Sequence, residues 1–222
     1  MRPVRDDRAL SFEMININFS IDAGGALEKI RSLGGEFYNK VVVSALNATA
    51  AKARAEMTRR ITAEYNVKAG DVRSQLFVSK ASRKNNKLFV SLQAFGRRRG
   101  RSSRNVIMFD ARTVEGRGPG KRVNVQFPNG DWRSIVVKPG GGVSIKIKKV
   151  GGRKLIPGAF IGNKGRTVFV RTGNGRDIKA VETLDVPGMF NTKRITQAVV
   201  SKVVQDLDKE VVRSINYYSN KI

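Results

Sequence analysis

The segment from Leu155 to Arg176, LIPGAFIGNKGRTVFVRTGNGR, constrains the fold more than any other part of the chain. Ile156 to Gly158 predicts a bend, and Ala159 to Ile161 predicts the start of a short strand. Gly162 to Gly165 has the composition of a turn, and Thr167 to Arg171 alternates as a returning strand. The sequence therefore predicts a β-hairpin here.

Two long amphipathic segments flank this hairpin. Apolar residues recur at near-helical spacing from Glu36 to about Tyr65, after an interruption at Gly34 and Gly35. A second helix is predicted after Pro187 and Gly188, with Thr192 as its N-cap. Its predicted buried stripe consists of Ile195, Val199, Val203, Leu207, Val211 and Ile215, broadened by Val200, Val204 and Val212. Its predicted solvent side holds Asp206, Asp208, Lys209 and Arg213.

Shorter elements are predicted from alternation and turn signals. Strands are expected over 12–21, 76–80, 87–94, 106–109, 122–127, 132–137 and 143–150, with an extended run from 176 to 187 after the turn at 173–175. Short helices are expected over 22–32 and 69–74. These elements predict an α+β fold, in which two long helices pack on a mostly antiparallel or mixed β-sheet. A basic Gly/Arg-rich loop insertion is expected at about 96–142 of a single domain spanning 1–222.

The order of the hairpin residues supports a family assignment. IPGAFI, a glycine-bearing turn, VFVR, and then a second turn with an arginine before an isoleucine together resemble the prophage minor tail protein Z family and related phage tail-completion proteins. The likeness is strongest over 143–190, and it implies that residues 1–222 form a single tail-completion domain. The residues that match the motif are expected to shape the hairpin and its contacts: Pro157, Phe160, Phe169, Arg171 and Arg176. Phe160 and Phe169 either fill the subunit core or lie at an interface.

Positive charge is concentrated in the middle of the chain. The formal net charge is +25, and residues 96–154 hold 16 basic and 3 acidic side chains. The loop from Gly96 to Arg104 has five arginines and no acid, so it cannot be buried. It either adds solubility as a solvated loop or contacts the DNA backbone, for which the planar arginine fork is suited. The expected DNA-facing or lumen-facing residues are Arg97, Arg98, Arg99, Arg101, Arg104, Lys121 and Arg122.

The residue types that are absent restrict the chemistry. The chain has no cysteine and no histidine, which removes thiol catalysis, disulfides, the usual zinc sites and histidine acid/base catalysis. The segment around Gly116 to Lys121 is not a phosphate-binding P-loop, because Glu115 replaces a glycine and Arg122 replaces a serine or threonine. Candidate acids are scattered, namely Asp110, Glu115, Asp177 and Asp185. We therefore expect no enzyme, cofactor or metal site, although a metal-dependent nuclease or hydrolase stays open because scattered carboxylates can converge.

Two functions are compatible with the sequence. The family resemblance implies a structural virion protein at the head-proximal end of a phage tail, which completes the tail and supports head-tail joining in a ring around the DNA channel. The implied partners are further copies in a sixfold ring, the tail tube or terminator protein, the head-tail connector proteins and the genomic DNA backbone. No membrane association is expected. The alternative is a sequence-nonspecific cellular nucleic-acid binding protein, although the basic loop lacks interleaved aromatic residues.

Overall fold

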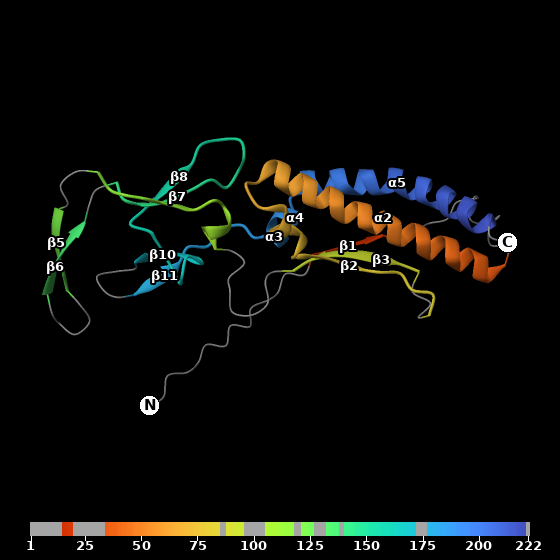
Figure 1. Cartoon of the computed structure of the whole chain (residues 1–222), viewed down its shortest axis with the longest axis horizontal. Helices are drawn as coiled ribbons and strands as arrows, with labels where there is room; N and C mark the ends of the chain where they lie inside the picture. Colours follow the sequence, from red (N-terminus) through yellow and green to blue (C-terminus); the bar gives the residue numbers. More distant parts are fainter. Residues whose placement is uncertain are drawn as a thin grey trace, which may run out of the picture.

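The protein folds into two lobes that are rich in different kinds of secondary structure (Figure 1). The computed structural model describes residues 34–84, 88–95, 105–117, 140–171 and 177–220, together with the backbone of 15–19, 121–126 and 132–137. One lobe, which we call the helix lobe, contains two long helices, two short helices and a three-stranded sheet. The other, which we call the hairpin lobe, contains only strands and one 3₁₀ turn within the described residues. The predicted α+β class is confirmed.

The sheet of the helix lobe is antiparallel with strand order β1-β3-β2. Its strands are β1 (Ile15–Phe19), β2 (Leu76–Ser79) and β3 (Val90–Ala94), each shorter than the segment predicted for it. Alternate residues of β3 face the helices and are fully buried, as the period of two requires. The segment 22–32, predicted as a short helix, lies outside the described residues.

The two long helices, α2 (Gly35–Glu64) and α5 (Lys193–Ser219), lie side by side and share one core with the sheet (Figure 1). Both helices and the short α3 (Ala69–Arg73) confirm predictions. A further short helix, α4 (Val186–Phe190), was not predicted, and it fills the core with Met189 and Phe190. Thr192 occupies the N-cap position of α5, but its side chain makes no capping hydrogen bond. No described helix has a stretch that is long and apolar enough to cross a membrane.

Two predictions about the faces of α5 are wrong. Asp206 is only 5% exposed, because it follows Val199 and Val203 by seven and three residues and so falls on the same helical stripe. Lys202 lies 3.0 Å from its carboxylate and offsets the charge. Three valines that were expected to broaden the buried stripe are instead exposed, since each directly follows a buried residue of the stripe and is turned about 100° from it around the helix: Val200, Val204 and Val212.

The hairpin lobe contains two three-stranded antiparallel sheets, β4-β7-β8 and β11-β10-β9, and a β5-β6 pair at its far end (Figure 1). The strands are β4 (Arg112–Val114), β5 (Lys121–Gln126), β6 (Trp132–Val137), β7 (Gly142–Ile145), β8 (Lys154–Pro157), β9 (Phe160–Gly162), β10 (Thr167–Arg171) and β11 (Ile178–Ala180). Strands β4 and β8 were not predicted. The predicted bend at Ile156 to Gly158 is displaced toward its end, because Pro157 still pairs in β8 and the left-handed φ occurs at Gly158.

The segment predicted as a strand over 106–109 is a 3₁₀ turn, η1 (Val106–Met108). The side chain of Asn105 accepts a hydrogen bond from the Ile107 N–H, which favours a helical turn over an extended strand. Asp110 then adopts a positive φ of 50°. The backbone therefore changes direction at this point instead of joining a sheet.

The end of α2 connects the two lobes. The predicted strand over 143–150 stops at Ile145, because the backbone beyond it bonds to α2 instead of to a neighbouring strand. The Asn66 N–H donates to the Ile147 carbonyl, and the Lys149 N–H donates to the Glu64 carbonyl. On the side of η1, Val106 packs in the core of the hairpin lobe while Phe109 packs in the core of the helix lobe. The lobes thus share both backbone hydrogen bonds and a buried aromatic ring.

Candidate functional site

The predicted hairpin is confirmed as β9 and β10. Phe160 lies opposite Phe169, and Gly162 lies opposite Thr167, in an antiparallel register. Three consecutive residues in the turn have positive φ angles, namely 50° at Asn163, 54° at Lys164 and 79° at Gly165. The Arg166 N–H closes the turn onto the carbonyls of Gly162 and Asn163. This arrangement presents the exposed Lys164 and Arg166 at the tip.

Three of the family-motif residues come together on one face of the hairpin. The Phe160 and Phe169 rings are 5.8 Å apart with a tilt of 31°, and the Arg171 guanidinium lies 5.5 Å from the centre of the Phe160 ring. Both rings are half-buried and belong to none of the clusters of buried side chains within the described residues. Pro157 lies apart from them in β8 and is exposed, and Arg176 lies outside the described residues. The face is suited to contact with another protein, because it combines aromatic area with a cation.

Asn105 is a structural residue that the sequence analysis missed. It is 5% exposed, and its side-chain amide pairs with both the N–H and the carbonyl of Val168 at 3.0 and 3.2 Å. The same side chain caps η1 through the Ile107 N–H. Asn105 thereby fixes the hairpin to the turn that leads into the helix lobe. No sequence signal marks it, because an asparagine beside a valine is equally typical of a surface turn.

The scattered carboxylates predicted from the sequence stay apart or serve the structure. Asp110 pairs with Arg112 at 2.9 Å and with Arg153 at 2.7 Å. Hydrogen bonds from these two guanidinium groups lower the pKa of Asp110 below its usual value, and Arg112 has the larger effect. Asp185 accepts a hydrogen bond from the Gly188 N–H and caps α4. In the described part of the chain, no three acidic side chains are grouped closely enough to hold a metal ion.

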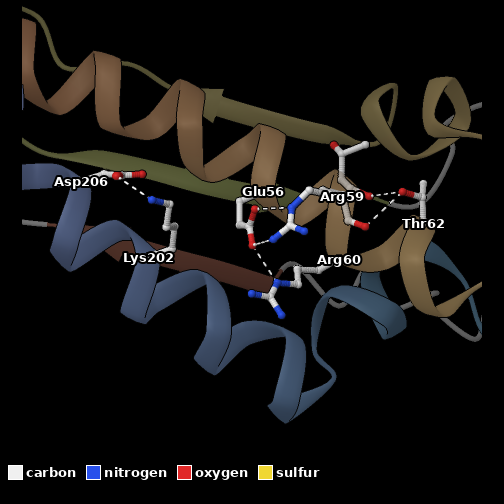
Figure 2. Close-up of polar contacts among 7 residues, drawn as sticks. Glu56, Arg59, Arg60, Thr62, Lys202 and Asp206 are labelled. Carbon is white, nitrogen blue, oxygen red and sulfur yellow. Dashed lines mark hydrogen bonds and ion pairs between the residues drawn. The ribbon is translucent and has the colours of Figure 1, made fainter.

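The helix lobe also has carboxylates neutralised by neighbouring cations (Figure 2). Glu56 on α2 is held by Arg59 through two hydrogen bonds of 2.6 and 2.7 Å and by Arg60 at 2.7 Å. The Arg59 guanidinium, aided by Arg60, lowers the pKa of Glu56 to about 2. A carboxylate that stays ionised in this way serves a structural role better than general acid catalysis.

Glu56 is expected to give the protein an acid-sensitive increment of stability. Because its pKa in the folded state is below the ordinary value of 4.5, its contribution is complete above pH 4.5 and is lost as the pH falls toward about 2. The difference in free energy of unfolding between the wild type and Glu56→Gln should therefore shrink over that interval. Urea denaturation at a series of pH values measures it. A difference that stays constant down to the acid end would contradict this assignment.

A cleft of about 870 Å³ lies between the lobes. Its walls come from the segment around α3, including Lys68, Asp71 and Gln75, and from the hairpin turn, including Asn163 and Arg166. The side-chain oxygen of Gln75 is buried without a hydrogen-bond partner. These polar walls can bind hydrogen-bonding groups, and the lining includes the hydroxyl of Thr167 but no thiol.

The residues predicted to face DNA are mostly outside the described part of the chain. This holds for Arg97, Arg98, Arg99, Arg101 and Arg104, whereas Lys121 and Arg122 begin strand β5, where only the backbone is described. Their role therefore stays a prediction. Positive charge also extends into the described hairpin lobe, because residues 140–171 contain eight basic side chains and no acidic one. Of these eight, Lys148 pairs with Glu64 and Arg153 with Asp110.

Comparison with known proteins identifies one family. The family described as prophage minor tail protein Z (GPZ) matches residues 23–221. No curated protein and no solved structure gives a significant match. The family match includes both long helices, the sheets of the hairpin lobe and the hairpin whose residues suggested the resemblance. Since it covers nearly the whole chain, the chain belongs to the prophage minor tail protein Z family.

Proposed function

We propose that this protein is a non-enzymatic structural component of a phage virion that completes the head-proximal end of the tail and supports its joining to the filled head. The observation that carries the proposal is the family match over residues 23–221, because a minor tail protein is a tail component. The proposed partners are further copies of the chain in a sixfold ring, the tail tube or terminator protein, and the head-tail connector. Carboxylates engaged in caps and ion pairs, such as Asp185 and Asp110, support a structural role over a catalytic one.

In this proposal the hairpin lobe faces the DNA channel. A net charge of +25 disfavours close packing of copies around a channel unless a polyanion neutralises part of it. The arginines of the loop 96–104 and the eight basic residues of 140–171 would meet the phosphate backbone without reading its sequence. The helix lobe would then supply the contacts with neighbouring proteins.

The proposal is tested by electron microscopy of lysates from a phage that lacks this gene. Joined particles, free heads and free tails are counted, and infectivity is measured. Defective tails, or complete tails that accumulate beside filled heads without joining, are the expected result. Normal and infectious particles would rule out the virion role.

The net charge of +25 also supports a second candidate, a sequence-nonspecific cellular nucleic-acid binding protein. Salt titration of duplex DNA binding by the isolated protein separates the two. A dedicated binder retains duplex at physiological ionic strength, whereas a ring component is expected to bind weakly until it assembles.

Replacing the five arginines of the loop 96–104 by serine is expected to leave folding intact and to impair DNA retention or delivery by assembled particles. The physical reason is that this loop carries five positive charges that only a polyanion can neutralise efficiently. Circular dichroism and thermal unfolding report on the fold, and release of DNA from the particles reports on retention. Unfolding of the variant would contradict a loop that faces solvent or DNA.

A further inference from the structure

Apart from Leu184, which precedes α4, the exposed large apolar side chains of the helix lobe fall into two separate groups within the described residues. One group lies on α5 and consists of Val200, Val204, Val212 and Tyr217. The other lies on strand β2 and just before strand β3 and consists of Phe77 and Phe89. Apolar side chains that are gathered in this way mark interaction surfaces more often than single exposed residues do.

The aromatic group lies on the face of the sheet that points away from the helices. Leu76 and Leu92 pack in the core, so Phe77, which alternates with Leu76, points to the opposite face. Phe77 is 50% exposed, and its ring meets the ring of Phe95 edge-to-face at 5.2 Å. Its cross-strand neighbour is the uncharged Gln93. We call this surface the outer sheet face.

The valine group defines a second surface, the outer α5 face, which points away from the core. Val204 is 61% exposed and Val212 is 56% exposed. The exposed side chains near them on the same side of the helix are Ser201, Gln205, Asp208 and, at the edge, Lys209. The face thus carries one acidic and one basic side chain and has no net charge, in a chain of net charge +25.

Charge decides where two copies of this chain can touch. At +25 each, copies repel one another wherever their lysines and arginines meet, so close contact requires surfaces without net positive charge. The cores of protein interfaces are depleted of charge and enriched in aromatic residues, and the outer sheet face has both properties. Exposed cations follow β2 at the border of the outer sheet face, namely Lys80, Arg83 and Lys84, and they complement Asp208 on the outer α5 face.

We infer that the outer sheet face of one copy packs on the outer α5 face of a second copy. The two faces belong to opposite sides of the helix lobe, so the contact joins different surfaces of identical chains. A repeated contact of this kind closes into a ring when the rotation between copies permits. That the contact closes into a ring rests on the function proposed above. The contact does not involve the hairpin lobe, which can then face the channel.

Disulfide trapping tests the contact directly, because the chain has no cysteine of its own. Ser79→Cys places a thiol on the outer sheet face, and Ser201→Cys places one on the outer α5 face, and both changes preserve the apolar side chains. Under mild oxidation, a mixture of the two variants should give a cross-linked dimer, whereas neither variant alone should, since a disulfide needs Cα atoms within about 7 Å. Val150→Cys in the hairpin lobe, 88% exposed, replaces Ser201→Cys in the matched control mixture.

A second variant links the cross-link to the apolar surface. Val204→Lys in the chain that carries Ser201→Cys should reduce the cross-linked product at least about tenfold, because it adds a cation beside the cations of the facing copy. The fold should be retained, since Val204 is exposed. Equal cross-linking in the control mixture, or a dimer from Ser201→Cys alone, would overturn the inference.

The experiment is performed with the purified protein at high concentration and with purified particles assembled from the two variants. Absence of the mixed product in both samples would overturn the inference. That result would leave the tail role standing, because the role is judged from head-tail joining in the phage that lacks the gene. Conversely, a cross-link between the two faces together with normal head-tail joining in the phage that lacks the gene would support the contact and contradict the proposed function.

Discussion

Replacing Asn105 by leucine is expected to lower the free energy of unfolding by about 3 kcal/mol. The side-chain amide of Asn105 is the partner of both the N–H and the carbonyl of Val168, at 3.0 and 3.2 Å, inside the hairpin lobe. Leucine has nearly the same size but no hydrogen-bonding group. The Val168 N–H left without a partner costs about 1–3 kcal/mol, whereas the Val168 carbonyl keeps the Val181 N–H, and loss of the cap of η1 costs about 1 kcal/mol more. Urea denaturation followed by circular dichroism measures the change.

The same substitution at an exposed position is the control. Asn216 lies on the exposed side of α5, so Asn216→Leu should change the free energy of unfolding by no more than about 0.5 kcal/mol. Equal effects of the two substitutions would show that Asn105 does not anchor the hairpin.

Phe109→Ala is expected to cost about 4 kcal/mol and to loosen the hairpin lobe from the helix lobe. The Phe109 side chain is fully buried in the core that α2, the sheet and α5 share. Its carbonyl accepts the Lys146 N–H, which holds the segment after β7. Truncation leaves a cavity at the place where the two lobes meet. Denaturation measures the cost, and hydrogen exchange of the amides in β4 and β7 measures the loosening.

Phe77→Ala provides the matched control, because Phe77 is half exposed and loses only part of an edge-to-face contact with Phe95. It should cost less than about 1.5 kcal/mol. Amide exchange in β4 and β7 that is the same in Phe109→Ala as in Phe77→Ala would contradict the role assigned to Phe109 as the link between lobes.

The sequence predicted elements whose signals are local. The two long helices and the β9-β10 hairpin follow from period and turn chemistry within a few residues, and the structure confirms them. Strand β4 and helix α4 are too short to show a period. The turn η1 depends on the side chain of Asn105, whose other partner, Val168, is 63 residues away. A contact at that separation leaves no local pattern.

The face of α5 shows the limit of pattern reasoning. Valine was assigned to the core and aspartate to solvent by hydropathy, but Asp206 is buried and Val204 is exposed. Whether a residue of α5 is buried depends on the side of the helix on which it lies, because the sheet and α2 cover only one side. Similarly, the motif residues Phe160, Phe169 and Arg171 were predicted as a group, but their stacking depends on the cross-strand register of the hairpin. The predicted DNA-facing arginines stay predictions.

The turn between β9 and β10 restricts which sequences the tip can accept. Asn163 and Lys164 are two consecutive non-glycine residues with positive φ, followed by Gly165. Such angles are tolerated by asparagine, aspartate and glycine but penalise valine, isoleucine and threonine. Variation among natural relatives should therefore change the charge of this tip freely while excluding β-branched residues from both positions. Relatives would then keep the length and shape of this turn even where the charges of its side chains differ.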